Sequence, residues 1–247
     1  MHQFFVDSSQ IGKEYVTITG GDVNHIRNVL RMRCGDTIRV SGSAGESYLC
    51  KIAEVGEDFV QADILSEGAQ TELPAQIYLF QALPKGDRME TVIEKAVELG
   101  ACEIIPVAMK YCVVKLDEKK AAAKVRKWQA QAETAAKQSK RSIIPKVHDV
   151  VNYQEALRMA NACDLRLVPY ENEEGMAGTR KILEKVQPGQ TISVIIGPEG
   201  GFAPEEIEAA RETMEVISLG RRILRTDTAG MCILSLLMLQ LEAGSMG

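Results

Sequence analysis

The spacing of hydrophobic positions divides the chain into two stretches of different type. In the first seventy or so residues, short apolar runs alternate with polar positions and are separated by glycine-rich turns, as at residues 20–21 and 42–45. This pattern is typical of a small β-barrel. The strands that it predicts cover residues 15–19, 37–41, 46–54 and 59–65.

One helix is predicted within this first stretch. Over residues 23–31 the helical period places Val23, Ile26 and Leu30 on one face. The polar residues 66–74 then have the composition of a linker. The chain is therefore expected to consist of a small β-domain at residues 1–72 and a larger domain at residues 73–247.

From residue 76 onward the pattern changes to strands that alternate with helices. Strands are predicted at residues 77–83, 103–109, 165–170, 191–196 and 215–219. Helices are predicted after the first of these strands, ending at Gly100, then over residues 117–140, between the later strands, and from about 228 to 243. Repeated strand–helix units indicate a mainly parallel sheet, with ligands beyond the carboxyl ends of its strands.

Composition narrows the class of protein. The 247 residues are 45% hydrophobic and 26% charged, as in an average globular protein and unlike a disordered chain. No apolar run approaches the roughly 18 residues that a membrane span requires, and the first residues lack a basic signal segment. We therefore expect a cytoplasmic protein. Six scattered cysteines without a C-x-x-C pair, and three scattered histidines, predict neither a disulfide framework nor a metal site.

Charge is distributed unevenly along the chain. The net charge is −5, but residues 115–146 carry ten Lys and Arg against three acids. There are two smaller basic groups. One lies in and after the predicted helix of the first domain and consists of Arg27, Arg31, Arg33 and Arg39, with His25 beside them; the other follows the strand at 215–219 and consists of Arg221, Arg222 and Arg225. Local basic islands allow phosphate contacts on an acidic protein, although for residues 115–146 a solvated helix face is an equally good interpretation. Trp128, inside this basic helix, is expected to pack in the core.

Three loops that leave strands of the second domain carry the candidate chemistry. They start at Pro169, at Ile196 and at Leu219, and the second contains three glycines around one proline. Such a loop lets the backbone approach a ligand closely. Glu205 and Glu206 open the next helix and disfavour a phosphate at its N-terminus. The G-x-G-x-x-G and P-loop fingerprints are absent, which argues against a dinucleotide enzyme and an ATPase.

Taken together, an ordered set of motifs closely resembles one family. The motifs are QALPKGDRME at 81–90, KAVELG at 95–100, QSKR at 138–141, IGPEGGF at 196–202 and LGRRILRTDTA at 219–229, preceded by HIRNVLR at 25–31. They are similar to the 16S ribosomal RNA (uracil-N3)-methyltransferases of the SPOUT superfamily, and the N-terminal motif resembles the PUA-like RNA-binding domain of that family. The resemblance spans essentially the whole chain.

The resemblance implies a fold, a cofactor and partners. It implies a trefoil knot over about residues 165–243, a homodimer, and methylation by S-adenosylmethionine of N3 of a uridine near the 3′ end of 16S rRNA in the small ribosomal subunit. The positions that match the donor site are Pro169, Tyr170, Ile196, Gly197, Pro198, Gly200, Leu219, Gly220, Ile223 and Leu224. RNA contacts are expected from His25, Arg27, Arg31, Lys85, Arg88, Lys140, Arg141, Arg221 and Arg222.

Two residues are candidates for catalysis. Arg225 is expected to face the target nucleotide, where it stabilises the developing uracil anion or fixes a phosphate. Asp227 is expected to orient Arg225 or to help take the N3 proton, although the family usually has Glu at this position. The structural alternative is that the two form an ion pair that caps the last helix. At the level of function, the alternative is an RNA-binding assembly factor without catalysis.

Overall fold

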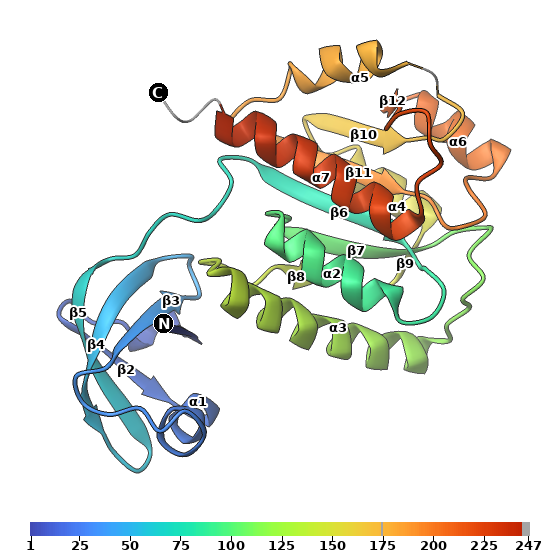
Figure 1. The fold of residues 1–247 in the computed structure, drawn as a ribbon. Helices are drawn as coiled ribbons and strands as arrows, with labels where there is room; N and C mark the ends of the chain where they lie inside the picture. Colours follow the sequence, from blue (N-terminus) through green and yellow to red (C-terminus); the bar gives the residue numbers. More distant parts are fainter. Residues whose placement is uncertain (174, 244–247) are drawn as a thin grey trace. The chain divides into compact units, whose positions relative to one another are not determined.

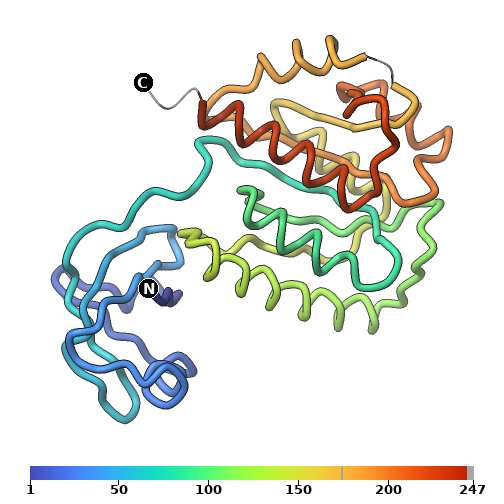
Figure 2. The backbone as a smooth tube through the Cα atoms, viewed as in Figure 1, coloured from blue at the N-terminus to red at the C-terminus, as the bar shows by residue number. Residues whose placement is uncertain are grey.

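The structure, a computed structural model, describes residues 1–173 and 175–243 (Figures 1 and 2). The chain forms two compact units. The first consists of Met1–Glu72 together with Ala136–Ile144, and the second of Leu73–Ala135 together with the chain from Pro145 onward. The sequence analysis placed residues 136–144 in the second domain, whereas their contacts assign them to the first unit.

The first unit is built on a five-stranded sheet with a curled shape (Figure 1). The strands, in spatial order, are β1 (His2–Val6), β3 (Thr37–Gly42), β4 (Ser47–Val55), β5 (Phe59–Glu67) and β2 (Tyr15–Thr19). β1 pairs with β3 in parallel, and the other neighbours are antiparallel. The four predicted strands are confirmed. Within the described residues no ladder joins β1 to β2, so the expected barrel is a curled sheet with two edges.

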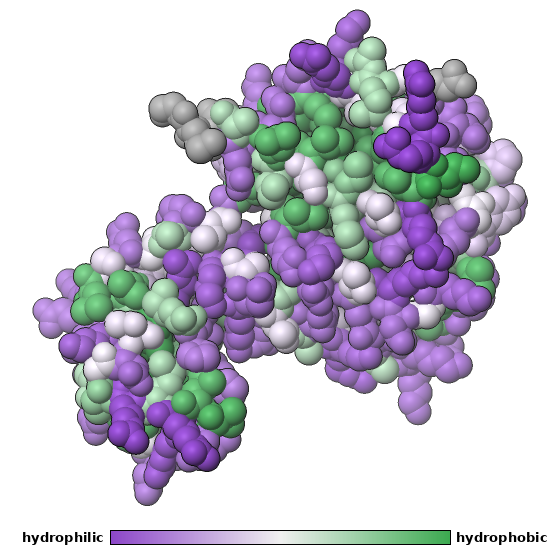
Figure 3. Space-filling model, viewed as in Figure 1, coloured by the Kyte–Doolittle hydropathy of each residue, from purple (hydrophilic) through white to green (hydrophobic). Residues whose placement is uncertain are grey.

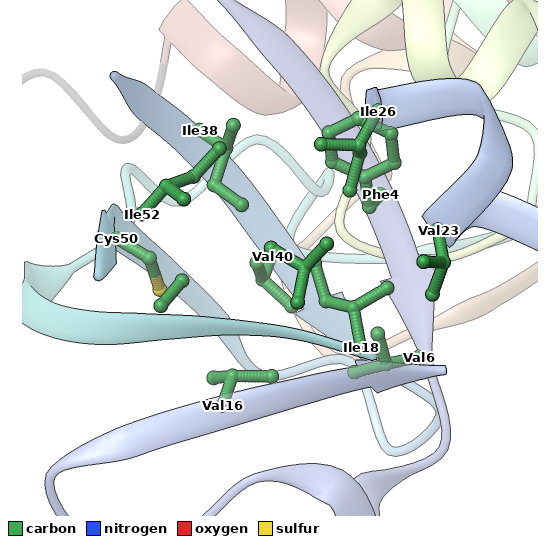
Figure 4. Close-up of a cluster of buried hydrophobic side chains, with 12 residues drawn as sticks. Phe4, Val6, Val16, Ile18, Val23, Ile26, Ile38, Val40, Cys50 and Ile52 are labelled. Atoms are coloured by element: carbon green, nitrogen blue, oxygen red, sulfur yellow. The ribbon is translucent and has the colours of Figure 1, made fainter. Parts of the chain in front are cut away.

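The concave side of this sheet holds a separate hydrophobic core (Figure 4). Ile18, Ile38, Val40 and Ile52 point into it from four positions along the strands, and each is at most 1% exposed. The sequence analysis missed β1, which contributes Phe4. In β1 the buried Gln3 precedes the buried Phe4, so the strand lacks the simple alternation of polar and apolar residues by which a strand is recognised.

The helix predicted at residues 23–31 begins two residues earlier than expected and is irregular. It consists of α1 (Gly21–Asn24) followed by the π-helical turn η2 (His25–Val29). Val23 and Ile26 are buried as the periodicity predicts. Arg31 lies beyond the helix in the left-handed region, with φ of 53°. Short π-helical turns occur often at functional sites, which agrees with the exposed basic residues of this turn.

Residues 136–144 are fixed to the first unit by one half-buried acid. Glu72 accepts hydrogen bonds from the Arg141 guanidinium and, at 2.7 Å, from the backbone N–H of Ser142. The amide of Gln3 donates to the backbone carbonyl of Arg141. These contacts join parts of the chain about seventy and more residues apart, so no local sequence pattern reveals them.

The second unit is a parallel sheet covered by helices. Its strand order is β12 (Glu215–Ile217), β10 (Leu165–Pro169), β11 (Thr191–Ile196), β6 (Gln76–Ala82), β7 (Glu103–Ala108) and β8 (Lys146–Val147), with β9 (Val151–Asn152) also paired to β7. Every one of these ladders is parallel. The predicted α/β class is confirmed, whereas β8 and β9 are two-residue strands, too short for a sequence pattern.

In the described part of this unit, six helices accompany the strands. They are α2 (Arg88–Glu98), α3 (Glu118–Ser139), α4 (Tyr153–Ala160), α5 (Met176–Leu183), α6 (Pro204–Arg211) and α7 (Thr226–Ala243). α2 and α7 lie side by side on one face of the sheet, and α4 covers the opposite face (Figure 1). Gly100 follows α2 with φ of 92°, as its predicted role as a C-cap requires. Trp128 in α3 is buried, as predicted.

The last helix, α7, is apolar on two faces. Ile233, Leu234 and Leu237 are buried against the unit, whereas Leu239 is 63% exposed. The surface in Figure 3 is correspondingly hydrophobic over the region where Figure 1 places α7. The helix begins at Thr226, two residues earlier than predicted, because the N–H of Ala229 already bonds to the carbonyl of Arg225 at 2.8 Å.

Candidate functional site

A cavity of about 350 Å³ lies where β10, β11 and β12 end. Its walls come mainly from the three loops that follow these strands, at residues 169–171, 196–202 and 219–226. Because the strands are parallel, their carboxyl ends meet at one edge of the sheet and bring the loops together. The volume is within the range of cavities that hold small ligands.

The cavity brings together nine of the ten positions expected to bind the methyl donor. They are Pro169, Tyr170, Ile196, Gly197, Pro198, Leu219, Gly220, Ile223 and Leu224. Gly200 is the exception, since it is not among the lining residues. A Cβ at Gly200 would lie 2.9 Å from the Cβ of Tyr111, so its missing side chain serves the packing of the loop against Tyr111.

An aromatic ring supports the loop at residues 196–202 from within. Phe202 is 7% exposed, lines the cavity and meets the ring of Tyr170 edge-on, with 6.2 Å between centroids. A Cβ on Gly197 would lie 2.8 Å from the Phe202 ring, so a side chain there would force the ring or the loop to move. Phe202 was part of the motif, but nothing in the sequence assigned it to the cavity wall.

A carboxylate fixes this loop to the start of α2. Glu199 accepts hydrogen bonds from the backbone N–H of Lys85 at 2.9 Å and from Nη1 of Arg88 at 3.0 Å. Burial of the Glu199 carboxyl raises its pKa, but these hydrogen bonds and the Arg88 charge outweigh burial and leave the pKa below its ordinary value. Arg88, predicted to contact RNA, therefore lines the cavity as the partner of Glu199, while the Lys85 side chain is exposed.

The N-terminus of α6 is closed to anions, as predicted. The buried carboxylate of Glu206 accepts hydrogen bonds from the backbone N–H groups of Ala203 and Lys110, each at 2.9 Å. The Glu206 carboxylate therefore places negative charge at the N-terminus of α6, which disfavours a phosphate there. The cavity therefore lacks a phosphate cradle at this helix.

The loop before α7 differs from the other walls in its exposed side chains. Arg221, Arg222 and Arg225 are exposed, and Ile223 is 86% exposed. Arg222 and Arg225 line the cavity, whereas Arg221 does not. Throughout residues 1–173 and 175–243, no carboxylate forms an ion pair with any of the three arginines. Their charge is therefore available to an anionic partner.

Asp227 does not pair with Arg225. Its Oδ1 atom is buried and has no hydrogen-bond partner within the part of the chain that the structure describes. The structural alternative, an ion pair of these two residues capping α7, is therefore not what the structure contains. Asp227 therefore does not orient Arg225 by direct contact. Its expected role as the acceptor of the N3 proton stays a prediction.

In the first unit, the expected RNA contacts have different environments. His25 and Arg27 are exposed on η2, and Arg31 is exposed just after it. The Lys140 ammonium donates to the backbone carbonyl of Lys137 at 3.0 Å. Arg141 is a correction, because it is only 3% exposed and is bound to Glu72. An arginine buried with its carboxylate stabilises the unit and is not available to a phosphate.

Two further properties concern ligands and membranes. Of the helices described here, none combines the length and apolar character needed to cross a bilayer. In residues 1–173 and 175–243, the acids, histidines and cysteines form no group of three that would hold a metal ion.

Comparison with known proteins identifies the family. Residues 71–238 match the model of an RNA methyltransferase domain, and residues 18–65 match the model of an RNA methyltransferase PUA domain. The chain is 36% identical over 250 residues to ribosomal RNA small subunit methyltransferase E of Bacillus subtilis, with 98% of both chains covered.

Solved structures give the same result. The methyltransferase E of Neisseria gonorrhoeae, crystallised with S-adenosyl methionine, has a TM-score of 0.78 and 30% identity, with 97% of both chains covered. A Legionella pneumophila methyltransferase with bound SAM has a TM-score of 0.80 and 31% identity, covering 95% of this chain and 96% of that one. Because the relatives match from end to end, this chain belongs to the family of RNA methyltransferases with an N-terminal PUA domain.

Proposed function

We propose that the cavity binds S-adenosylmethionine and that the protein methylates N3 of a uridine near the 3′ end of 16S rRNA. The observation that carries the proposal is the convergence of nine expected donor positions, from three separate loops, on one cavity. The solved relatives from Neisseria and Legionella hold the same donor.

The lining residues suit this molecule. Ile196, Leu219 and Leu224 offer apolar surface to an adenine ring, and the glycine-rich loop exposes backbone groups close to it. The Glu171 and Glu199 carboxylates also line the cavity, which suits a ligand with cationic sulfonium and ammonium groups. When bound, the donor supplies an electrophilic methyl group. The protein holds it in one orientation and excludes water, and positioning alone accounts for up to about 7–11 kcal/mol in ideal cases.

The uracil has to lose a proton during the reaction. N3 carries a hydrogen and lies on the pairing edge of the base, so the uridine must be unpaired to enter a site. We assign to Arg225, exposed at the cavity, the stabilisation of negative charge as the N3 proton leaves. Asp227, with a buried oxygen that lacks a donor, is our candidate acceptor for this proton.

The remaining basic residues are assigned to RNA binding. The π-helical turn of the PUA domain exposes His25 and Arg27, with Arg31 directly after it, and the loop before α7 exposes Arg221 and Arg222. With Lys85 and Lys140 they form the proposed contacts to the small-subunit RNA, and the proposal includes a cytoplasmic location.

We also propose a homodimer that uses α7. Cys232, Leu236 and Leu239 recur on the side of α7 that is not buried, so an apolar stripe faces away from the core. A second copy of the chain would cover this stripe. Sedimentation of the purified protein tests the assignment, because Leu239→Glu is expected to shift a dimer toward the monomer.

The knot over residues 165–243 is part of the same proposal. The chain passes from β10 to its neighbour β11, then to β12 on the other side of β10, and returns through α7 to pack on β6 and β11. This order of crossings is compatible with a threaded chain. An experimental structure traced continuously from Leu165 to Ala243 tests it.

The decisive test uses small ribosomal subunits that lack the modification. With labelled donor, the protein should transfer the label to one uridine, and mapping should place the methyl group on N3. Subunits that already carry the modification are the control and should take up no label. Calorimetry with S-adenosylmethionine and its demethylated product should show binding. No binding of either molecule would leave only an RNA-binding scaffold.

A further inference from the structure

A buried chain of two hydrogen bonds connects the end of β6 with two walls of the cavity. Nε2 of Gln81 lies 2.9 Å from Oγ1 of Thr226, which lies 2.6 Å from the backbone carbonyl oxygen of Gly197. Gln81 is fully buried and Thr226 is 5% exposed. Gln81 belongs to β6, Gly197 to the loop after β11, and Thr226 is the first residue of α7.

The direction of these hydrogen bonds follows from counting protons. The Gly197 carbonyl can only accept, so the single hydroxyl proton of Thr226 must point to it. Thr226 then has only lone pairs to offer to Gln81, which must donate through its amide group. The Gln81 amide also lies 3.2 Å from the carbonyl of Ala82, which fits the same orientation. The opposite orientation of the amide would leave Gly197 without its donor.

The other end of the Gln81 side chain shows what this orientation costs. Its Oε1 atom is buried and has no partner among the described residues. A buried oxygen without a hydrogen bond is unfavourable by about 1–3 kcal/mol. A core that served stability alone would more simply place an apolar side chain at this position. The amide is therefore retained for what it donates to.

The two bonded groups belong to the segments that form opposite parts of the site. Gly197 lies between Ile196 and Pro198, and all three line the cavity. Thr226 lines it directly after Arg225. One hydroxyl thus sets the distance between the glycine-rich loop and the arginine-bearing loop, and it fixes the plane of the Gly197–Pro198 peptide.

We infer that Gln81 and Thr226 are positioning residues that hold the donor-binding loop and the catalytic loop in register. The inference rests on the proposed donor cavity. Neither residue needs to touch the methyl group or the uracil. Their effect on the reaction passes through the Gly197 carbonyl and through the backbone next to Arg225.

Thr226→Val and Thr226→Ser separate this role from simple packing. Valine keeps the shape of the side chain and removes the hydroxyl, whereas serine keeps the hydroxyl. By calorimetry, Thr226→Val should bind S-adenosylmethionine about tenfold more weakly, equivalent to roughly 1.4 kcal/mol, and its kcat on small subunits should fall. The KM for the RNA should stay the same. Thr226→Ser should restore both donor affinity and kcat.

Ser193→Ala is the matched control in the same unit. The Ser193 hydroxyl is buried in β11 and donates to the carbonyl of Ala160 at 3.1 Å, but Ser193 does not line the cavity. Loss of the Ser193 hydroxyl should lower the melting temperature about as much as Thr226→Val does, and it should leave donor affinity unchanged. Should Thr226→Val fail to fold, Gln81→Met removes the other hydrogen bond of the chain with similar side-chain volume. The Thr226 hydroxyl then keeps its bond to Gly197 but loses the donor that orients it, so a smaller loss of donor affinity is expected.

The outcomes are distinguishable. Thr226→Val or Gln81→Met binding the donor as tightly as the unchanged protein would overturn the inference alone. Equal loss of donor affinity in Ser193→Ala would also overturn it, because the effect would then be general destabilisation. If the unchanged protein bound neither S-adenosylmethionine nor its product, the proposed function would fail and this inference with it.

Discussion

Two loops of the same cavity are built in opposite ways. The loop at residues 196–202 is held by packing and by hydrogen bonds. Phe202 fills the space beside Gly197, and Glu199 is bonded to Lys85 and Arg88. The loop at residues 219–225 has exposed arginines without ion-pair partners within the described chain, and an Ile223 that is 86% exposed. The first loop is preformed, whereas the second offers free charge and free apolar surface.

This difference separates two tasks within one site. A small ligand is bound best by a wall that needs no rearrangement, since ordering a loop costs conformational entropy. An RNA is bound through charges that are unpaired before the RNA arrives, because a paired arginine must first lose its partner. The preformed loop therefore suits the methyl donor, and the arginine loop suits the RNA and the reacting base.

The largest effect is expected from Arg225→Ala in the arginine loop. If Arg225 stabilises charge as the N3 proton leaves, its loss should lower kcat by about 10²–10³-fold, with donor affinity nearly unchanged by calorimetry. Arg221→Ala is the matched control, because it removes the same charge from the same loop without touching the cavity. It should keep its turnover at saturating RNA. Normal turnover by Arg225→Ala would remove this residue from the mechanism.

A smaller effect is expected from Gly197→Ala in the preformed loop, and it should fall on donor affinity, which Arg225→Ala leaves nearly unchanged. The added methyl group would meet the Phe202 ring at 2.8 Å. Overpacking typically costs about 1–3 kcal/mol, so donor affinity should fall roughly tenfold while RNA affinity is retained. Gly178→Ala in α5 is the control, since a Cβ there has nothing within 4 Å. Equal donor affinity of Gly197→Ala and the unchanged protein would show that the loop is not preformed.

Arg222→Ala should weaken RNA binding. Each lost phosphate contact lowers the slope of log affinity against log salt by about 0.7–1, so the variant should show a shallower slope and a modestly weaker affinity. Binding of a small-subunit RNA fragment measured at several salt concentrations checks this. An unchanged slope would mean that Arg222 does not contact a phosphate.

The smallest effect concerns the pH dependence of the preformed loop. The pKa of Glu199 is lowered from 4.5, so this carboxyl binds its proton more weakly in the folded chain than in the unfolded one. Its contribution to stability is complete above the ordinary pKa and is lost as the pH falls through the lowered pKa. Glu199→Gln should therefore cost less than about 1 kcal/mol of unfolding free energy at pH 7.

Urea unfolding of both proteins from pH 7 down to pH 3 measures this difference. It should shrink toward the acid end of the series, because the unchanged protein loses the Glu199 carboxylate there while the variant never had it. A difference that stays constant over the whole series would show that the Glu199 charge does not hold the loop to Lys85 and Arg88.

The sequence predicted those elements whose signal is local. Four of the five strands of the first unit and the five longer strands of the second follow from runs of apolar residues, and the end of α2 follows from Gly100. The three loops of the site were located for a related reason. Parallel strands end at one edge, so finding the strands also finds the loops that follow them.

The sequence did not predict contacts between residues that lie far apart along the chain. Arg141 reads as one more residue of a basic run, yet it is buried because Glu72 lies opposite. Gly200 reads as part of a ligand loop, yet its missing side chain accommodates Tyr111. The two buried hydrogen bonds that connect Gln81, Thr226 and Gly197 join three such parts, so no spacing within a single motif reveals them.

The sequence by itself thus determined the class of fold, the loops that carry the site and the residue types within them, since each depends on neighbours a few positions away. Only the tertiary structure decided which charges are free and which are paired, and which glycines face the cavity and which face a side chain. These outcomes depend on contacts between segments far apart along the chain, where burial and proximity decide whether a charged or polar group is satisfied within the protein or remains available to a ligand.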